Sequence, residues 1–97
     1  MERAEFEAEL RREGYEASEG EVKPNQHRAS HAHEFDVRLL VLSDSIALAF
    51  DNDRSDFGPN DTCHIRAGTM HEEHIGPDGV RYVIGRRPAE KAPTNPV

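Results

Sequence analysis

The stretch HAHEFDVRLLVL, residues 31–42, decides the fold of this chain. It joins two histidines, spaced one residue apart, to an apolar run typical of a buried strand. In an extended strand alternate side chains point to the same face, so His31 and His33 are expected to bind one ion together. A third imidazole, that of His71, follows a turn at residues 67–69 and would complete a three-nitrogen site with open coordination positions. Zn, Fe, Mn, Ni and Cu all suit such a site, and the spacing does not choose among them.

Composition limits the classes of protein to which the chain can belong. Its 97 residues are enough for one compact domain. The formal net charge of -7 disfavours nucleic acids and anionic membranes as partners. Cys63 is the only cysteine, so no intrachain disulfide is expected. The N-terminal residues are charged rather than apolar, and no apolar run has membrane-spanning length, so we expect a cytoplasmic protein.

The pattern along the chain predicts one short helix followed by strands. Residues 2–13 are rich in good helix formers, with Phe6 and Leu10 on one face, and Gly14 is a natural C-cap. From residue 15 the pattern has the period of two that is typical of strands. Strands are expected at 15–22, 28–33, 35–42, 46–50, 62–66, 70–75 and 80–85.

Turn residues separate these predicted strands. Turns are expected at Pro24-Asn25, at Asp44-Ser45 and at Pro77-Asp78-Gly79, and residues 51–60 are expected to form a polar loop. Residues 88–97 contain three prolines and almost no bulky apolar side chains, which predicts a disordered tail. The chain is therefore expected to be a single domain over residues 1–87, with a barrel at about 15–86.

Several short strands with turns between them favour an all-β sandwich or small barrel. The run at residues 39–42 is apolar on both faces, so one face is expected to line the barrel. The other face needs cover from the N-terminal helix or from a second subunit. We therefore expect a homodimer.

Two motifs carry a resemblance to the cupin superfamily. Residues 31–42 resemble its first motif, and DTCHIRAGTMH, residues 61–71, resembles its second. The resemblance spans roughly residues 20–86, and the ending GVRYVIGRR, residues 79–87, is similar to that of small single-domain bacterial cupins. It implies a double-stranded β-helix, or jelly roll, with a divalent metal inside one end of the barrel. The first motif would supply two histidines and a carboxylate, and the second motif one histidine.

The carboxylate is where this sequence departs from the family. The family glutamate would fall on Val37 or Arg38, and the nearest acid is Asp36, one place early. Strict alternation points Asp36 away from the histidines, whereas a β-bulge at Glu34-Phe35 would turn it inward. Asp36 is thus predicted as the fourth metal ligand or as a partner of the ligands. Glu34 is expected to face solvent.

Three glycines of the family are replaced by other residues. The positions hold Asn25, Asp44 and Asn60. Asn and Asp tolerate left-handed backbone geometry better than other non-glycine residues, so these exchanges support the turn assignments.

The remaining reactive side chains have less specific interpretations. His27, His64 and His74 are expected to lie outside the metal site. Glu73 lies on the same face as His71 and could reach the barrel mouth as an acid or base. Cys63 is expected to be a small buried hydrophobe.

Three further side chains are expected in the core or at the surface. Phe50 and Met70 are expected in the core or the pocket, whereas Arg38 is expected to point outward into solvent.

These observations favour a metal-dependent enzyme acting on a small chelating ligand with a carboxylate or carbonyl group. Iron would suit a dioxygenase, whereas Zn, Mn or Ni would suit an isomerase or lyase. The alternatives are a non-catalytic module that senses a metal or ligand and acts through a partner, and a structural domain whose dimer contact is its purpose. Fold alone does not choose among them.

Overall fold

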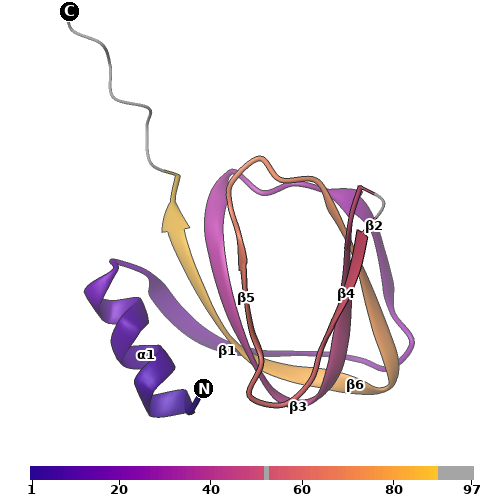
Figure 1. The fold of residues 1–97 in the computed structure, drawn as a ribbon, viewed down its shortest axis with the longest axis horizontal. Coiled ribbons are helices and arrows are strands. Elements are labelled where there is room, and N and C mark those ends of the chain that lie inside the picture. The colour runs from indigo at the N-terminus through magenta and orange to yellow at the C-terminus, as the bar shows by residue number, and fades with distance from the viewer. Residues whose placement is uncertain (52, 90–97) are drawn as a thin grey trace, which may run out of the picture.

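The computed structural model describes residues 1–51 and 53–89. Within these ranges it contains one helix and six strands (Figure 1). Their bounds are α1 Arg3–Arg12, β1 Glu16–Val22, β2 His27–His31, β3 Phe35–Phe50, β4 Asp53–Phe57, β5 Thr62–Ile65 and β6 His71–Pro88. The predicted helix and the mostly β architecture are confirmed.

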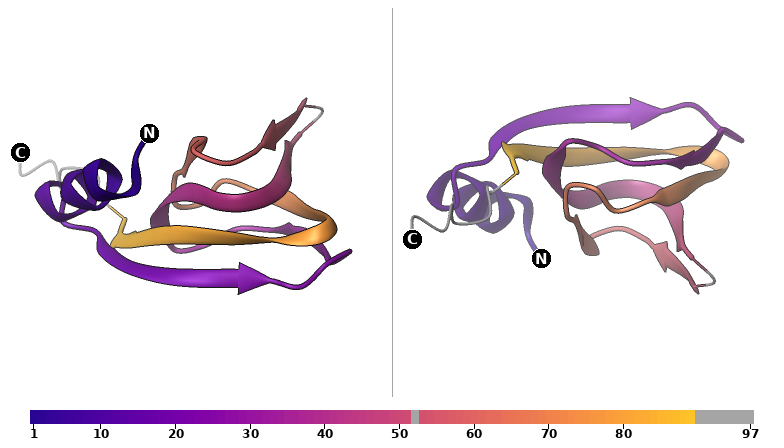
Figure 2. Two further views of the ribbon diagram at one scale, coloured as in Figure 1. Left: turned by 90° about the horizontal axis from the view of Figure 1, so that it is seen from below. Right: turned by 90° about the horizontal axis from the view of Figure 1, so that it is seen from above.

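The two long strands β3 and β6 form the centre of a single antiparallel sheet. Strands β1 and β2 pair with β6, and strands β4 and β5 pair with β3. The sheet curves round on itself, so that the outer strands face each other across the interior (Figures 1 and 2). This is the jelly-roll barrel that the sequence predicts.

Two predicted turns are wrong, because they bend a strand without ending it. Strand β3 continues through Asp44, whose φ is 66°, and β6 continues through Gly79, whose φ is 78°. Asp44 pairs with Val80, next to Gly79, and the β3–β6 register shifts on both sides of Asp44. One left-handed residue on each strand therefore lets both strands bend together at one level.

The polar loop predicted at residues 51–60 is also partly wrong. Strand β4 lies within it and pairs with the second half of β3, from Ile46 to Phe50. Four of its five residues are exposed, so it has no apolar alternation by which to recognise it.

Asparagine and aspartate adopt left-handed geometry at the three positions that the sequence singled out. The φ angles of Asn25, Asp44 and Asn60 are 59°, 66° and 71°. The left-handed geometry expected at these positions is confirmed, although at Asp44 it bends β3 instead of ending it.

Helix α1 covers the outer surface of the barrel. Phe6 and Leu10 are fully buried and pack with Tyr15, Leu40 and Val83. Gly85 lies beneath Leu10, where an added Cβ would come within 2.6 Å of a Leu10 methyl carbon. The helix, rather than a second subunit, therefore covers the second apolar face of the 39–42 run.

Arg38 points outward as expected, but the helix shields it from solvent. Its guanidinium contacts the carboxylates of Glu9 and Glu13 at 3.2–3.4 Å and lies 5.2 Å from the centre of the Phe6 ring. The expectation of a solvated side chain is wrong because helix α1 and the residue that caps it, Glu13, supply the two acidic partners.

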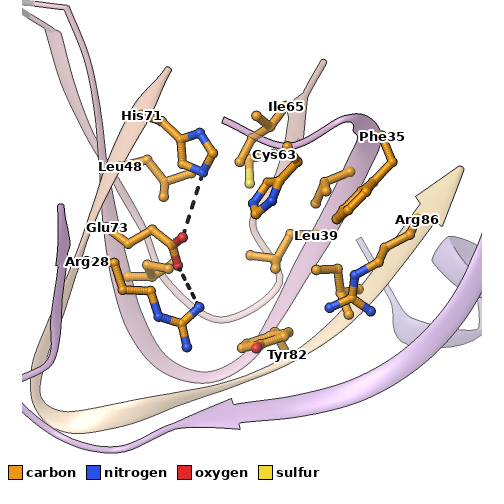
Figure 3. A pocket seen from close by; sticks show the side chains of 14 residues that line it. Arg28, Phe35, Leu39, Leu48, Cys63, Ile65, His71, Glu73, Tyr82 and Arg86 are labelled. Carbon is orange, nitrogen blue, oxygen red and sulfur yellow. Dashed lines mark ion pairs between the residues drawn. The ribbon is translucent and has the colours of Figure 1, made fainter. Parts of the chain in front are cut away.

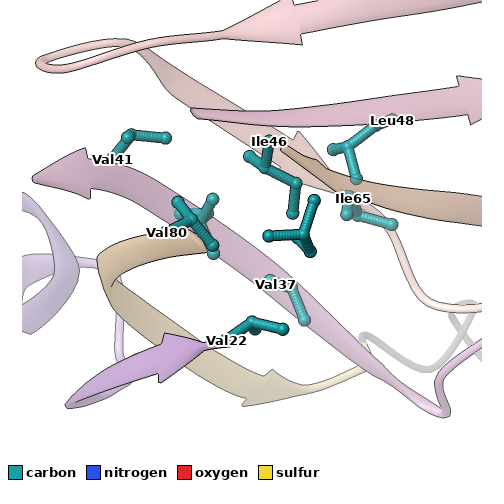
Figure 4. Close-up of a cluster of buried hydrophobic side chains, with 9 residues drawn as sticks. Val22, Val37, Val41, Ile46, Leu48, Ile65 and Val80 are labelled. Carbon is teal, nitrogen blue, oxygen red and sulfur yellow. The ribbon is translucent and has the colours of Figure 1, made fainter. Parts of the chain in front are cut away.

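The barrel interior holds the main hydrophobic core (Figure 4). Its buried members are Val22, Val37, Leu39, Val41, Ile46, Leu48, Ile65, Ile75 and Val80. Phe50 packs against this cluster as expected, whereas Met70 is 54% exposed, so its assignment to the core or pocket is wrong.

The ends of the chain are only partly described. Pro88 is the last residue of β6, and most of the predicted tail, residues 90–97, lies outside the described residues. Among the described residues, the structure contains no helix with the length and apolar character needed to cross a membrane.

We predict that docking of α1 contributes strongly to stability. Leu10→Ala should lower the free energy of unfolding by about 2–5 kcal/mol, because it leaves a cavity between the helix and the sheet. The exposed Met70→Ala is the matched control and should change it by no more than about 0.5 kcal/mol. Urea unfolding of both variants measures the difference, and equal losses would show that the helix is not docked as described.

Candidate metal centre

Three histidines and one glutamate meet at the mouth of the barrel. His31 ends β2, His33 follows it, and His71 and Glu73 lie on β6. One potential ligand atom from each residue lies within 4.8 Å of the corresponding atoms of the others. His31 is directly opposite His71 in the β2–β6 pairing, and their ring centres are 4.4 Å apart. Segments 40 residues apart in the chain thus supply a single site.

Backbone carbonyls fix the tautomers of two of these histidines. His31 Nδ1 lies 2.8 Å from the carbonyl oxygen of Ala29, and His71 Nδ1 lies 3.0 Å from that of Thr69. A carbonyl oxygen only accepts hydrogen bonds, so each Nδ1 carries the hydrogen. Nε2 is then the ring atom that each histidine offers to the site.

Glu73 brings a carboxylate between these two Nε2 atoms. Its Oε2 lies 3.0 Å from His31 Nε2 and 3.7 Å from His71 Nε2, while its Oε1 lies 3.6 Å from Arg28 Nη1. An unprotonated Nε2 and a carboxylate oxygen both present lone pairs, so this approach needs a proton or a metal cation between them. Three imidazoles and one carboxylate suit Zn, Fe, Mn, Ni or Cu, so the residues present fit a divalent transition metal.

His33 completes the group as a neutral imidazole. Its ring stacks on Phe35, with the centroids 4.9 Å apart, and lies 5.3 Å from the ring of His71. Burial lowers the pKa of His33 below its ordinary value, and the neighbouring His31 and His71 lower it further. An imidazole must be neutral at the ligating nitrogen in order to bind a metal.

The structure does not bring Asp36 into this group. Asp36 Oδ1 accepts a hydrogen bond from the Ala67 amide at 2.9 Å, and Oδ2 lies 3.3 Å from Arg87 Nη2. These contacts keep the pKa of Asp36 below its ordinary value, with the Ala67 bond as the main cause. Asp36 therefore ties β3 to the turn that precedes His71.

The opposite orientation of Asp36 follows from strand alternation. Phe35, Val37 and Leu39 line the interior, so Asp36 between them faces away. The bulge that would have turned it inward does not occur in the β3–β6 register at this point. Glu73 supplies the carboxylate instead. The sequence indicated this residue because Glu73 and His71, two positions apart in a strand, lie on the same face.

Other histidines lie outside this group, as expected. His64 is exposed, and its Nε2 lies 3.3 Å from the hydroxyl of Tyr15. His27 and His74 stack on each other with ring centres 4.4 Å apart, in a separate group with Glu72.

A cavity of about 90 Å³ extends from the histidines into the barrel (Figure 3). Apolar side chains such as Leu39, Leu48 and Ile65 form much of its wall. Arg28, Tyr82 and Arg86 also line it, so the cavity combines an apolar wall with cationic and hydroxyl groups.

Cys63 lies in this wall as a neutral thiol. Burial raises the pKa of Cys63 to about 12, and the charge of Glu73 contributes in the same direction. A thiol with so high a pKa is a poor nucleophile near neutral pH, so Cys63 acts as the small apolar side chain that the sequence predicts.

We predict that Asp36 stabilises the fold in a pH-dependent way. Asp36→Asn should lower the free energy of unfolding at neutral pH by about 1–3 kcal/mol, because the Ala67 amide and Arg87 lose a charged acceptor. Folding lowers the pKa of Asp36, so its contribution is complete above the unfolded-state value of about 3.9 and disappears as the pH falls through the lower folded-state value.

Urea unfolding of wild type and Asp36→Asn across this pH range measures the effect. The two curves should converge at acid pH. A difference in stability that stays constant from neutral to acid pH would contradict the assignment.

Comparison with known proteins supports the architecture. No protein-family model and no curated protein matches the sequence. A Rhizobium leguminosarum protein of unknown function aligns with a TM-score of 0.71 and 16% identity, covering 76% of this chain and 70% of that one. A cupin superfamily protein from Desulfitobacterium hafniense aligns with a TM-score of 0.65 and 16% identity, covering 78% of this chain and 68% of that one.

A third solved structure is more similar in sequence. The polyketide cyclase RemF from Streptomyces resistomycificus shares 27% identity at a TM-score of 0.64, and the match covers 81% of this chain. It spans only 57% of RemF. Together with the antiparallel topology, these likenesses show that the chain has the jelly-roll fold of cupin superfamily structures.

Proposed function

We propose that His31, His33, His71 and Glu73 hold one divalent transition metal, beside which the barrel cavity binds a small chelating ligand. This proposal rests on the approach of Glu73 Oε2 to the Nε2 atoms of His31 and His71. In both histidines, Nδ1 already makes a hydrogen bond to a backbone carbonyl. A metal cation would relieve the lone-pair repulsion at this point and would use all the donors that converge there.

The proposed chemistry is Lewis-acid activation of a carbonyl, enol or carboxylate group. When bound, the metal would polarise such a group at its open coordination positions, which suits a lyase or isomerase with Zn, Mn or Ni and a dioxygenase with Fe. The likeness to a polyketide cyclase supports a small carbonyl-containing substrate class. Because the match spans little more than half of that protein, the support extends to the class and not to the reaction.

The side chains of the cavity would select and orient this ligand. Arg86 lines the cavity and has a neutral partner, the hydroxyl of Ser18 at 3.4 Å, so its charge is available to an anionic group. Arg28 lies near Glu73 and offsets the charge of that carboxylate. The apolar wall formed by residues such as Leu39 and Leu48 would exclude water from the bound ligand.

A homodimer in the cytoplasm remains part of the proposal. Helix α1 already covers the outer apolar surface near Leu40, so dimerisation would have to use another surface. Light scattering coupled to size exclusion measures the mass of the particle in solution.

We predict that Glu73, and not Asp36, is needed for metal retention. Protein purified without an affinity tag should hold close to one equivalent of metal at this site, and Glu73→Gln and His33→Ala should each hold about one equivalent less than wild type, because each removes a donor. Asp36→Asn is the matched carboxylate control and should keep the metal. Elemental analysis of the four proteins measures the content.

Two outcomes would contradict this assignment. If wild type and Glu73→Gln held the same amount of metal and Asp36→Asn held less, Asp36 would be the fourth ligand instead of Glu73. Negligible metal in every protein, even after exposure to Zn, Fe, Mn, Ni and Cu, would exclude the metal proposal and favour a binding or interaction module.

We predict that Arg86 gives the cavity its preference for anions. Oxalate, an anionic bidentate probe, should bind zinc-loaded wild type at least about tenfold more tightly than zinc-loaded Arg86→Gln, because a charge-assisted hydrogen bond contributes about 1.5–3 kcal/mol. Arg81→Gln, which removes an arginine paired with Glu19 outside the cavity, is the control. Calorimetric titration measures both, and equal weakening by the two variants would indicate a general charge effect.

A further inference from the structure

The outer face of the β2–β6 pair carries a second group of potential ligands. We propose that His27, Glu72 and His74 form a separate binding site for a divalent transition metal, which links β2 to β6. One donor atom from each of the three residues lies within 4.8 Å of the other two. This is a two-histidine, one-carboxylate donor set, which suits imidazole-preferring metals such as Zn, Cu or Ni.

Strand alternation separates this group from the one inside the barrel. Residues 71–74 read His-Glu-Glu-His, and in β6 His71 and Glu73 point inward. Glu72 and His74 therefore lie on the opposite face. The two groups share strands but no residue, so the outer site does not depend on the function proposed for the inner one.

The cross-strand register brings the two outer histidines together. His27 is directly opposite His74, and their rings stack with centroids 4.4 Å apart and planes 15° apart. Directly opposed side chains on antiparallel strands have their Cβ atoms close enough for both to reach one ion.

Both imidazoles converge on the same oxygen atom. Glu72 Oε2 lies 3.3 Å from His74 Nε2 and 3.6 Å from His27 Nε2. Two ligands at a tetrahedral angle around a metal, each about 2.1 Å from it, are separated by about 3.4 Å, so both distances are already close to those of a zinc site. A bound metal would replace the hydrogen-bond contact between His74 Nε2 and Glu72.

The surroundings leave room for an ion and for water ligands. The residues of β3 that pair with His74 and Glu72 are Ala47 and Ala49, whose side chains are small. The side chains of His27, Glu72 and His74 are 54%, 42% and 33% exposed, so a metal would enter from solvent without rearrangement of the barrel. The net charge of -7 favours approach of a cation.

A metal at the outer site would stabilise the pairing of β2 with β6. Strand β2 has only five residues, four of them exposed, and its pairing partner is β6. An ion joining His27 to His74 would hold β2 in register at one end, while His31 lies at the other. Zinc at the outer site should therefore stabilise the strand that carries His31.

Zinc titration of the full chain tests the proposal. Wild type freed of metal should bind two equivalents of zinc, and His74→Gln and Glu72→Gln should each bind one, with affinity for the lost equivalent reduced at least about tenfold. His64→Gln, which removes an exposed histidine outside both groups, and Glu21→Gln, which removes an exposed carboxylate of β1, are the controls and should keep both equivalents. Equal stoichiometry in His74→Gln and wild type would overturn the proposal.

The inner group provides the complementary measurement. His71→Ala should lose one equivalent and keep the other, and adding His74→Gln should remove the remainder. If wild type binds one equivalent that His74→Gln abolishes, the outer site stands and the inner proposal fails. If wild type binds one equivalent that His74→Gln retains, the outer proposal fails and the inner one stands.

Discussion

The antiparallel pairing of β3 with β6 is the constraint on which the rest of the structure depends. It runs from Phe35 opposite Pro88 to Ala49 opposite Glu72, and the other strands pair with one of these two. A shift of β6 by one residue against β3 would exchange the two faces of β6, moving His71 and Glu73 outward and Glu72 and His74 inward. The register therefore decides which pair of side chains meets His31 and His33. At the bend, where Asp44 and Gly79 adopt left-handed geometry at the same level, the register shifts, and it continues from Ile46 opposite Ile75 to Ala49 opposite Glu72.

Much of the fold was predictable because its determinants are local. Phe6 and Leu10, spaced four apart, mark the buried face of α1, and asparagine or aspartate at positions 25, 44 and 60 marks left-handed backbone geometry. The errors arise where local signals are ambiguous. Asp44 bends a strand with the same residue type that ends strands elsewhere, and β4 is polar because it is held by pairing with β3 rather than by burial.

The candidate site was predictable in its histidines but not in its carboxylate. His31, His33 and His71 follow from motif spacing, since each lies at a fixed position relative to a strand. The identity of the carboxylate, by contrast, depends on how the strands pair. Arg38, one of the positions where the resemblance places the glutamate, points outward to Glu9 and Glu13 in and just after α1. Asp36 accepts a hydrogen bond from the turn at Ala67. The inward carboxylate comes from Glu73, whose role is visible only once β2 and β6 are paired.

Charge balance explains why Glu73 is tolerated in this position. A carboxylate with only 12% of its side chain exposed needs cationic or hydrogen-bonding partners, because burial otherwise favours its neutral form. Glu73 divides its two oxygens between Arg28 and the imidazoles, so one oxygen has a permanent cation and the other faces His31 and His71. Arg28 is directly opposite Glu73 in the register, just as His31 is opposite His71. The short strand β2 thus supplies both the cation that offsets the carboxylate and one of the imidazoles beside it, which makes the docking of β2 the step that assembles the site.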